Sequence, residues 1–167
     1  MILIYTGNGK GKTSACVGQA LRALGQDLRV GFGQFMKKDV HAGEQVMLQR
    51  LLGENYRAGG RGFFRKEEER EEHRAAALTL LEWARERLPR LDMLLLDESL
   101  YALRAGLLER AEVEDLLQRA RAADCHLVLS GRDAPQWLMD MADLVTEMGE
   151  IKHPAQSGVK AQRGIEF

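Results

Sequence analysis

Apolar runs of strand length alternate with amphipathic segments of helix length along the chain. The apolar runs predict strands at residues 2–5, 29–34, 91–96, 126–129 and 144–146. The amphipathic segments predict helices at residues 13–24, 44–52, 66–88, 112–122 and 135–141. Strands that are apolar along their whole length are buried on both sides. The pattern therefore predicts an α/β fold, a mostly parallel sheet with helices on both faces.

Glycine and proline mark the limits of these elements. Gly53 and Pro89 directly follow two of the expected helices. Residues 55–65 are rich in glycine and are expected to form a loop. No internal repeat or long flexible linker is visible, so we expect residues 1–167 to form one domain. Ligands of such sheets bind beyond the carboxyl ends of the strands, which is where the candidate chemistry is found.

A glycine-rich segment with the sequence Thr-Gly-Asn-Gly-Lys-Gly-Lys-Thr occupies residues 6–13, between the first expected strand and the first expected helix. This context is that of a Walker A motif, or P-loop, and favours P-loop NTPase (RecA-like) architecture, although Thr6 replaces the usual first glycine. Glycines let backbone N–H groups turn inward around phosphate oxygens, and the helix N-terminus adds partial positive charge. We expect ATP to contact Gly7, Asn8, Gly9, Lys10, Gly11, Lys12, Thr13 and Ser14. The alternative is a tight strand-to-helix connection without a ligand.

An acidic pair, Asp97 and Glu98, follows the apolar run at residues 91–96. A carboxylate at the end of a buried strand is the Walker B pattern, in which the acid orients Mg²⁺ or its water. We therefore expect Thr13, Asp97 and Glu98 to hold Mg²⁺, and the sequence leaves open which carboxylate touches the metal. It also leaves open which bond of ATP breaks, so a generic P-loop ATPase or kinase stays an alternative on spacing alone.

Composition and charge argue against a protein that binds nucleic acid or a membrane surface. Apolar residues make up 45% and charged residues 29% of the chain, and the net charge is −1, so nothing suggests a nucleic-acid or membrane-surface partner. The longest apolar run, residues 93–96, is far too short to span a bilayer. Strand-like sequence begins at Ile2, so we do not expect a signal peptide. The two cysteines, Cys16 and Cys125, lack the spacing of metal ligands. We expect buried free thiols in a reducing compartment, and hence a cytoplasmic protein.

Several segments together resemble the P-loop type of ATP:corrinoid adenosyltransferase, also called cob(I)alamin adenosyltransferase. The resemblance begins with the P-loop itself, including its missing first glycine. The motifs in the closing third of the chain are the most specific part of the resemblance, because P-loop proteins in general do not share them. The matching segments lie at residues 6–13, 34–37 (QFMK), 96–98 (LDE), 130–132 (SGR), 142–148 (ADLVTEM), 152–154 (KHP) and 158–166 (GVKAQRGIE).

This resemblance implies that the cobalt(I) of a corrinoid, such as cob(I)alamin or cob(I)yrinic acid a,c-diamide, attacks C5′ of ATP and expels triphosphate. Cobalt(I) is itself the nucleophile, so no activated Ser, Cys or general base is needed. The resemblance implies catalytic roles for Lys12, Thr13 and Glu98. Arg132 follows the end of an expected strand, close to where the P-loop should lie, so we expect it to contact ATP. A solvated turn arginine is the alternative for Arg132. The resemblance further implies Mg²⁺, a homodimer and a flavoprotein reductant.

One loop departs from the family's pattern. Members usually carry Gly-x-Gly-Phe-x-Trp before the long helix, and its aromatic residues line the corrinoid pocket. Here Phe63 matches, Phe64 follows it, and Arg65 stands in place of the tryptophan. Phe63, Phe64 and Arg65 are the expected corrinoid contacts. Many members also have an N-terminal arm over the corrinoid, whereas strand-like sequence begins here at once. These departures keep open a second alternative, a non-catalytic paralogue that binds ATP and corrinoid.

Overall fold

A single parallel sheet organises the protein. The computed structural model describes residues 1–38 and 42–166. The strands lie in the order β3-β2-β4-β5-β1-β6, and every neighbouring pair is parallel. Their bounds are β1 Ile2–Thr6, β2 Val30–Gln34, β3 Tyr56–Ala58, β4 Met93–Asp97, β5 His126–Ser130 and β6 Leu144–Glu147. The predicted α/β class with a parallel sheet is confirmed.

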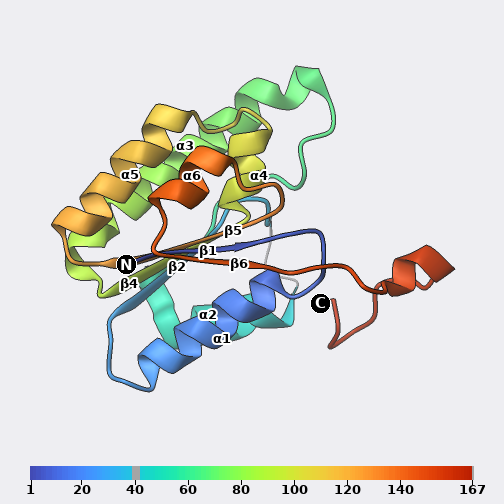
Figure 1. Cartoon of the computed structure of the whole chain (residues 1–167), viewed down its shortest axis with the longest axis horizontal. Helices are drawn as coiled ribbons and strands as arrows, with labels where there is room; N and C mark the ends of the chain where they lie inside the picture. The colour runs from blue at the N-terminus through green and yellow to red at the C-terminus, as the bar shows by residue number, and fades with distance from the viewer. Residues whose placement is uncertain (39–41, 167) are drawn as a thin grey trace.

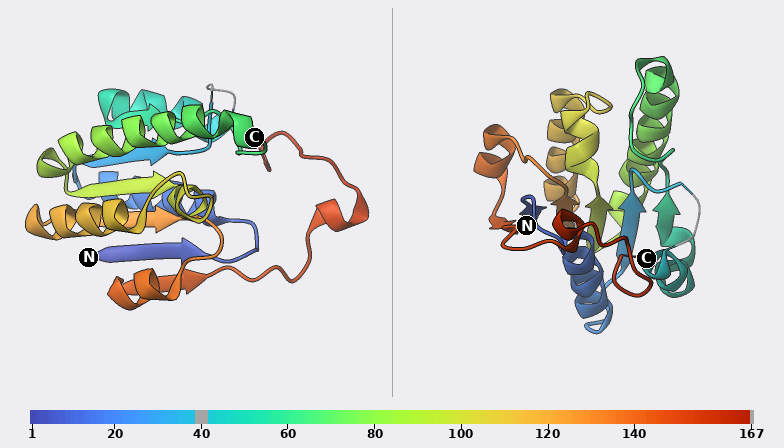
Figure 2. Two further views of the ribbon diagram at one scale, coloured as in Figure 1. Left: turned by 90° about the horizontal axis from the view of Figure 1, so that it is seen from above. Right: turned by 90° about the vertical axis from the view of Figure 1, so that its right-hand side faces the viewer.

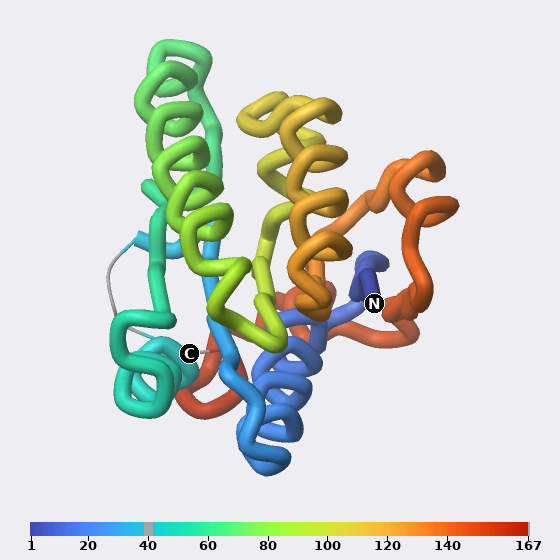
Figure 3. The backbone as a smooth tube through the Cα atoms, turned by 90° about the vertical axis from the view of Figure 1, so that its left-hand side faces the viewer, coloured from blue at the N-terminus to red at the C-terminus, as the bar shows by residue number. Residues whose placement is uncertain are grey.

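Helices cover both faces of the sheet, as predicted (Figure 1). One face carries α1 (Lys12–Leu24) and α2 (Gly43–Leu52). The opposite face carries α3 (Arg70–Arg87), α4 (Ser99–Arg104), α5 (Arg110–Ala122) and α6 (Gln136–Met141). Viewed along the sheet, α3 and α5 lie side by side on that second face (Figure 3).

Burial on both faces explains why residues 93–96 of the central strand β4 are all apolar. Leu94 and Leu96 lie in the apolar cluster beneath α3 and α5. Met93 and Leu95 point to the other face and join the cluster beneath α1 and α2. A strand buried on both faces has no position that favours a polar residue, so the usual alternation is absent.

Two elements differ from the sequence-based expectation. Residues 56–58, expected as loop, form β3, which pairs with β2 through only three residues and is too short for a periodic signal. Residues 99–104, to which no element was assigned, form α4. The long helix α3 also begins at Arg70 rather than at residue 66, because residues 67–69 form a 3₁₀ turn.

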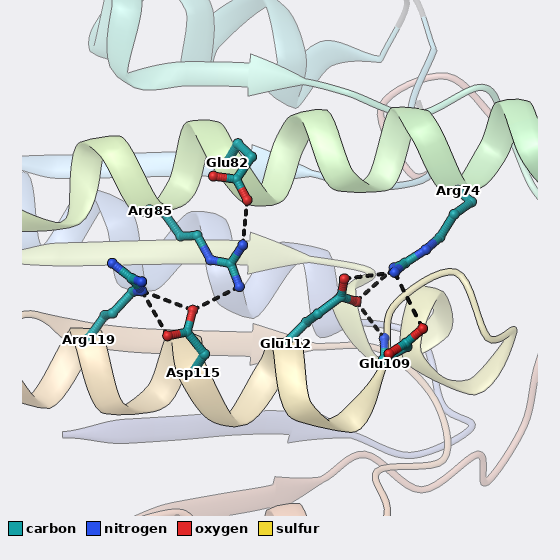
Figure 4. Close-up of polar contacts among 7 residues, drawn as sticks. All are labelled: Arg74, Glu82, Arg85, Glu109, Glu112, Asp115 and Arg119. Atoms are coloured by element: carbon teal, nitrogen blue, oxygen red, sulfur yellow. Dashed lines mark hydrogen bonds and ion pairs between the residues drawn. The ribbon is translucent and has the colours of Figure 1, made fainter.

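Ion pairs join the outer surfaces of α3 and α5 (Figure 4). The guanidinium of Arg74 donates to both carboxylate oxygens of Glu112, each at 2.7 Å. Arg85 lies 2.8 Å from Asp115, which also accepts a hydrogen bond from Arg119. These pairs fix the two helices relative to one another. In the described part of the chain, no helix is long and apolar enough to cross a membrane.

Candidate active site

The P-loop lies at the carboxyl end of β1 and leads directly into α1. Gly7 has a φ of +98°, and a Cβ there would collide with the backbone oxygen of Met148. The amide of Gly9 donates to that same oxygen at 2.8 Å. Glycine at position 7 is therefore required for close packing against the segment after β6, in addition to the phosphate approach expected from the motif.

Lys12 is held inside the loop. Its ammonium group donates to the carbonyl oxygens of Gly7 and Gly9, both at 2.8 Å, and the residue is 7% exposed. Burial lowers the pKa of Lys12, and the positive charge of Arg132 lowers it further, while Glu98 and Asp97 act in the opposite direction. Because the ammonium group is bound to neutral carbonyl oxygens, an anionic ligand would strongly stabilise its charged form.

Asp97 is the centre of a buried hydrogen-bond network. It is fully buried and accepts hydrogen bonds from the hydroxyl groups of Ser130 at 2.6 Å and Thr13 at 3.1 Å. The side-chain amide of Gln34 donates to Asp97 at 3.1 Å, and the hydroxyl of Tyr56 donates to Gln34 at 2.8 Å. Such a network, fully satisfied inside a protein, fixes the positions of its members. The structure thus joins the predicted residues Thr13 and Asp97 directly.

Glu98 has a strained backbone and an unfavourable charge environment. Its φ of +57° is unusual for a residue with a side chain and costs on the order of 1 kcal/mol. Burial raises the pKa of Glu98, and the neighbouring carboxylate of Asp97 raises it further. Positive charges on Lys12 and Arg132 partly offset these effects. Strain and a perturbed pKa together in one cleft residue are typical of functional sites.

The donor set fits Mg²⁺ held jointly by protein and nucleotide. Thr13, Asp97 and Glu98 offer hydroxyl and carboxylate oxygens, the hard ligands that Mg²⁺ prefers. Within residues 1–38 and 42–166, no group of three or more His, Cys, Asp or Glu side chains could hold a metal alone. Mg²⁺ typically uses one or two carboxylates and completes its coordination with phosphate oxygens and water.

A cleft of about 530 Å³ opens beside the P-loop. Most of the predicted site residues line it: Gly9, Lys10, Gly11, Lys12, Thr13, Ser14, Phe63, Glu98 and Arg132. Among the described residues, the predicted contacts that do not line this cleft are Gly7, Asn8, Asp97, Phe64 and Arg65. Three lining residues were not singled out from the sequence: Val17, Gly43 and Glu44. Five others lie in segments that resemble the family but had no assigned site role: Lys37, His153, Gly164, Ile165 and Glu166.

The three predicted corrinoid contacts point in different directions. Phe63 lines the cleft and is 52% exposed. The ring of Phe64 packs edge-on against His73 of α3, with ring centres 5.6 Å apart, and lies beneath the guanidinium of Arg70. Arg65 is exposed. Adjacent side chains in this loop therefore face different surfaces, and their order in the sequence does not reveal which surface each one faces.

The C-terminal segment contributes a wall that was recognised as a motif but given no role. After β6 the chain leaves the carboxyl end of the sheet, makes a wide loop and returns to the same end (Figure 2). There Glu166 lies 3.9 Å from the ammonium of Lys10, and Ile165 lines the cleft. Lys37, which also lines the cleft, pairs with Glu44 at 3.3 Å. Part of the closing segment 158–166, which carries the most specific resemblance to the family, thus lies at the cleft.

Comparison with known proteins gives a consistent result. The family model of the ATP:corrinoid adenosyltransferase BtuR/CobO/CobP matches residues 1–167. A corrinoid adenosyltransferase of Pseudomonas aeruginosa is 38% identical over 170 residues, covering 100% of this chain and 83% of that protein. The corrinoid adenosyltransferase CobA of Salmonella typhimurium is 36% identical over 169 residues, with coverage of 100% and 85%.

Among solved structures, the flagellar accessory protein FlaH from Methanocaldococcus jannaschii superposes with a TM-score of 0.53 at 13% identity. The match covers 87% of this chain and 69% of that chain, and it bears on the fold alone. It agrees with the α/β fold predicted from the sequence. The sequence matches, which extend over the whole chain, bear on the family. The chain belongs to the ATP:corrinoid adenosyltransferase family.

Proposed function

We propose that the protein transfers the 5′-deoxyadenosyl group of ATP to the cobalt(I) of a corrinoid and releases triphosphate. The electron pair of cobalt(I) forms the cobalt–carbon bond with C5′. The bond between C5′ and its oxygen breaks, and its electron pair leaves with the triphosphate. The observation that carries the proposal is one cleft that is lined both by residues 9–14 of the P-loop and by the exposed ring of Phe63.

On the phosphate side, the P-loop stabilises the leaving group. Lys10 and Lys12 both line the cleft and supply positive charge where negative charge grows on the departing triphosphate. Arg132 lines the same cleft and adds a further cation. Because Lys12 is already held by the loop, little reorganisation opposes this stabilisation. The loop therefore acts as a cradle for triphosphate rather than as a hydrolytic site.

The metal-binding roles divide between the two carboxylates. Asp97 is buried and already accepts hydrogen bonds from Thr13, Ser130 and Gln34. We propose that Asp97 orients the hydroxyl group of Thr13 and a metal-bound water. Glu98 lines the cleft, and we propose that its carboxylate faces the metal. Mg²⁺, when bound, would neutralise charge on the triphosphate.

The protein's own side chains need not form a covalent intermediate. Burial raises the pKa of Cys16 well above its usual range, and burial raises the pKa of Cys125 to about 11. Both thiols are therefore protonated at neutral pH and poor nucleophiles. Cobalt(I) supplies the nucleophile instead, and the cleft has to align it with C5′. Alignment of this kind can lower a barrier by several kcal/mol or more.

Family membership also suggests the wider setting of the reaction. The protein would act as a single domain, as a homodimer and in the cytoplasm, and it would receive electrons from a flavoprotein reductant. Each of these points can be measured directly, by sedimentation for the dimer and by reconstitution with a flavoprotein for the reductant.

The test uses chemically reduced cob(I)alamin and cob(I)inamide with magnesium–ATP. The visible spectrum reports the cobalt–carbon bond, and ion-exchange chromatography separates triphosphate from phosphate. We expect product that depends on the protein, with one triphosphate released for each corrinoid adenosylated. Steady phosphate release without corrinoid would instead support an ATPase. Tight corrinoid binding without product would support a non-catalytic paralogue. Either result would overturn the proposal.

A further inference from the structure

The helix α4 contacts both the turn after β5 and the loop that carries Phe63. It begins immediately after Glu98, at the end of β4. The turn after β5 packs directly against it, because a Cβ at Gly131 would lie only 2.8 Å from the Cβ of Leu100. Gly131 also has a φ of +143°, so this close approach requires glycine. The position of α4 is thus fixed from the nucleotide side of the site.

From α4, Tyr101 reaches the loop that carries the predicted corrinoid contacts. Its hydroxyl donates to the backbone oxygen of Phe64 at 3.1 Å. Its ring meets the ring of Phe63 edge-on, with ring centres 5.1 Å apart and planes 79° from each other. One side chain therefore makes a backbone contact and a ring contact with two successive residues of that loop.

Tyr101 is itself held by Arg104, one turn further along α4. The guanidinium of Arg104 lies over the ring of Tyr101, 5.3 Å from its centre. Arg104 also forms an ion pair with Asp133, the residue after Arg132. The contacts run from the turn that bears Arg132, through Arg104 and Tyr101, to Phe63. This chain of contacts connects the nucleotide side of the cleft with the aromatic side.

We infer that Tyr101 is a positioning residue that sets the orientation of Phe63 for the corrinoid. The inference rests on the proposed function, because it takes Phe63 as a corrinoid contact. Tyr101 is not among the described residues that line the cleft, so it acts through Phe63 rather than by touching the substrate. Phe63 is half exposed, and its edge-on contact with Tyr101 limits the orientations that its ring can adopt.

Two substitutions separate the contacts of Tyr101. Tyr101→Phe removes the hydrogen bond to the loop backbone and keeps the ring contact. Tyr101→Leu removes both. From the usual contributions of one hydrogen bond and one aromatic pair, we expect the KM for corrinoid to rise about threefold in the first variant and about tenfold in the second. The KM for ATP should stay within about twofold of the wild-type value, because the P-loop is untouched.

A matched control is available on α6, where the guanidinium of Arg110 lies over the ring of Trp137, 4.7 Å from its centre. Trp137→Leu removes an arginine–aromatic contact of the same kind away from the cleft. It should leave both KM values unchanged. Equilibrium binding of cob(II)inamide, followed by its visible spectrum, gives a readout that does not depend on turnover. Its Kd should rise in the Tyr101 variants in the same order as the KM.

The outcomes separate this inference from the proposed function. A wild-type protein that binds cob(II)inamide but makes no adenosylated product would overturn the proposed function, while the binding series would still test Tyr101. Unchanged corrinoid affinity in Tyr101→Phe and Tyr101→Leu would overturn the role of Tyr101. Equal losses of ATP and corrinoid affinity would also overturn it, because they would indicate a general structural role. If Tyr101→Leu does not fold, Tyr101→Phe alone decides.

Discussion

The two sides of the cleft are built in different ways. On the phosphate side, Lys12 is 7% exposed and Asp97 is fully buried, and both make several hydrogen bonds. On the aromatic side, Phe63 is 52% exposed and is held by a ring contact with Tyr101. The phosphate side is pre-organised by the backbone and by buried polar groups. The aromatic side depends on a few side-chain contacts, and we propose that bound corrinoid completes its burial.

This difference predicts how substitutions divide. Changes on the phosphate side should reduce catalysis strongly, because charge stabilisation in the transition state is lost there. Changes on the aromatic side should mainly alter the affinity for corrinoid, because the contacts there are apolar and partly exposed.

The largest effect is expected from Lys12→Ala. The substitution removes a cation that is preset toward the triphosphate, so we expect kcat to fall about 100-fold or more and ATP affinity to fall with it. Affinity for cob(II)inamide should change by less than about twofold. Calorimetry with magnesium–ATP and the single-turnover rate check this. An unchanged ATP affinity would show that the P-loop does not bind the phosphates as described.

Glu98→Gln should separate activity from stability. We expect kcat to fall about tenfold or more, because an amide is a poorer metal ligand than a carboxylate. At neutral pH and without metal, the variant should be more stable than the wild type, because burial and Asp97 disfavour the charged form of Glu98. Denaturant unfolding in the presence of a chelator measures this difference in the free energy of unfolding.

The pH dependence of that difference has a definite sign. Because the pKa of Glu98 is raised in the folded state, the folded state binds the proton more tightly than the unfolded state does. The wild-type protein therefore loses stability from this group as pH rises from the ordinary value of 4.5 through the raised pKa. The advantage of Glu98→Gln should be absent in acid and greatest at neutral pH. An advantage that shrinks as pH rises would contradict this account.

The smallest effect is expected from Arg65→Trp, which restores the residue usual in the family. Arg65 is exposed, so the substitution should fold normally. An added apolar wall should lower the KM for cob(I)alamin a fewfold and leave ATP affinity unchanged. Arg57, exposed on the edge strand β3, offers a matched control as Arg57→Trp. Equal effects of the two substitutions would mean that position 65 is not near the corrinoid.

The sequence predicted the phosphate side better than the aromatic side, for a physical reason. The P-loop and the acidic pair at residues 97–98 are local patterns, in which adjacent residues serve one ligand. The network through Gln34 and Tyr56 joins residues from three strands, and nothing in their spacing marks it. The short elements β3 and α4 were missed because they are too brief for periodicity.

The loop at residues 63–65 shows the same limit on a smaller scale. The resemblance to the family implied three adjacent corrinoid contacts. In the structure, only Phe63 lines the cleft, while Phe64 packs toward α3. Which way each ring points depends on contacts with Tyr101 and His73, which lie outside the loop on α4 and α3. The roles proposed for Phe64 and Arg65 therefore await measurement.

The most direct test of the central claim follows the fate of the phosphates. Wild-type protein is mixed with cob(I)inamide and ATP labelled on the γ-phosphate, and products are separated after one turnover. If the P-loop holds triphosphate as a leaving group, the label appears in triphosphate in an amount equal to the adenosylated corrinoid. Label that appears in inorganic phosphate at a rate independent of corrinoid would contradict the account.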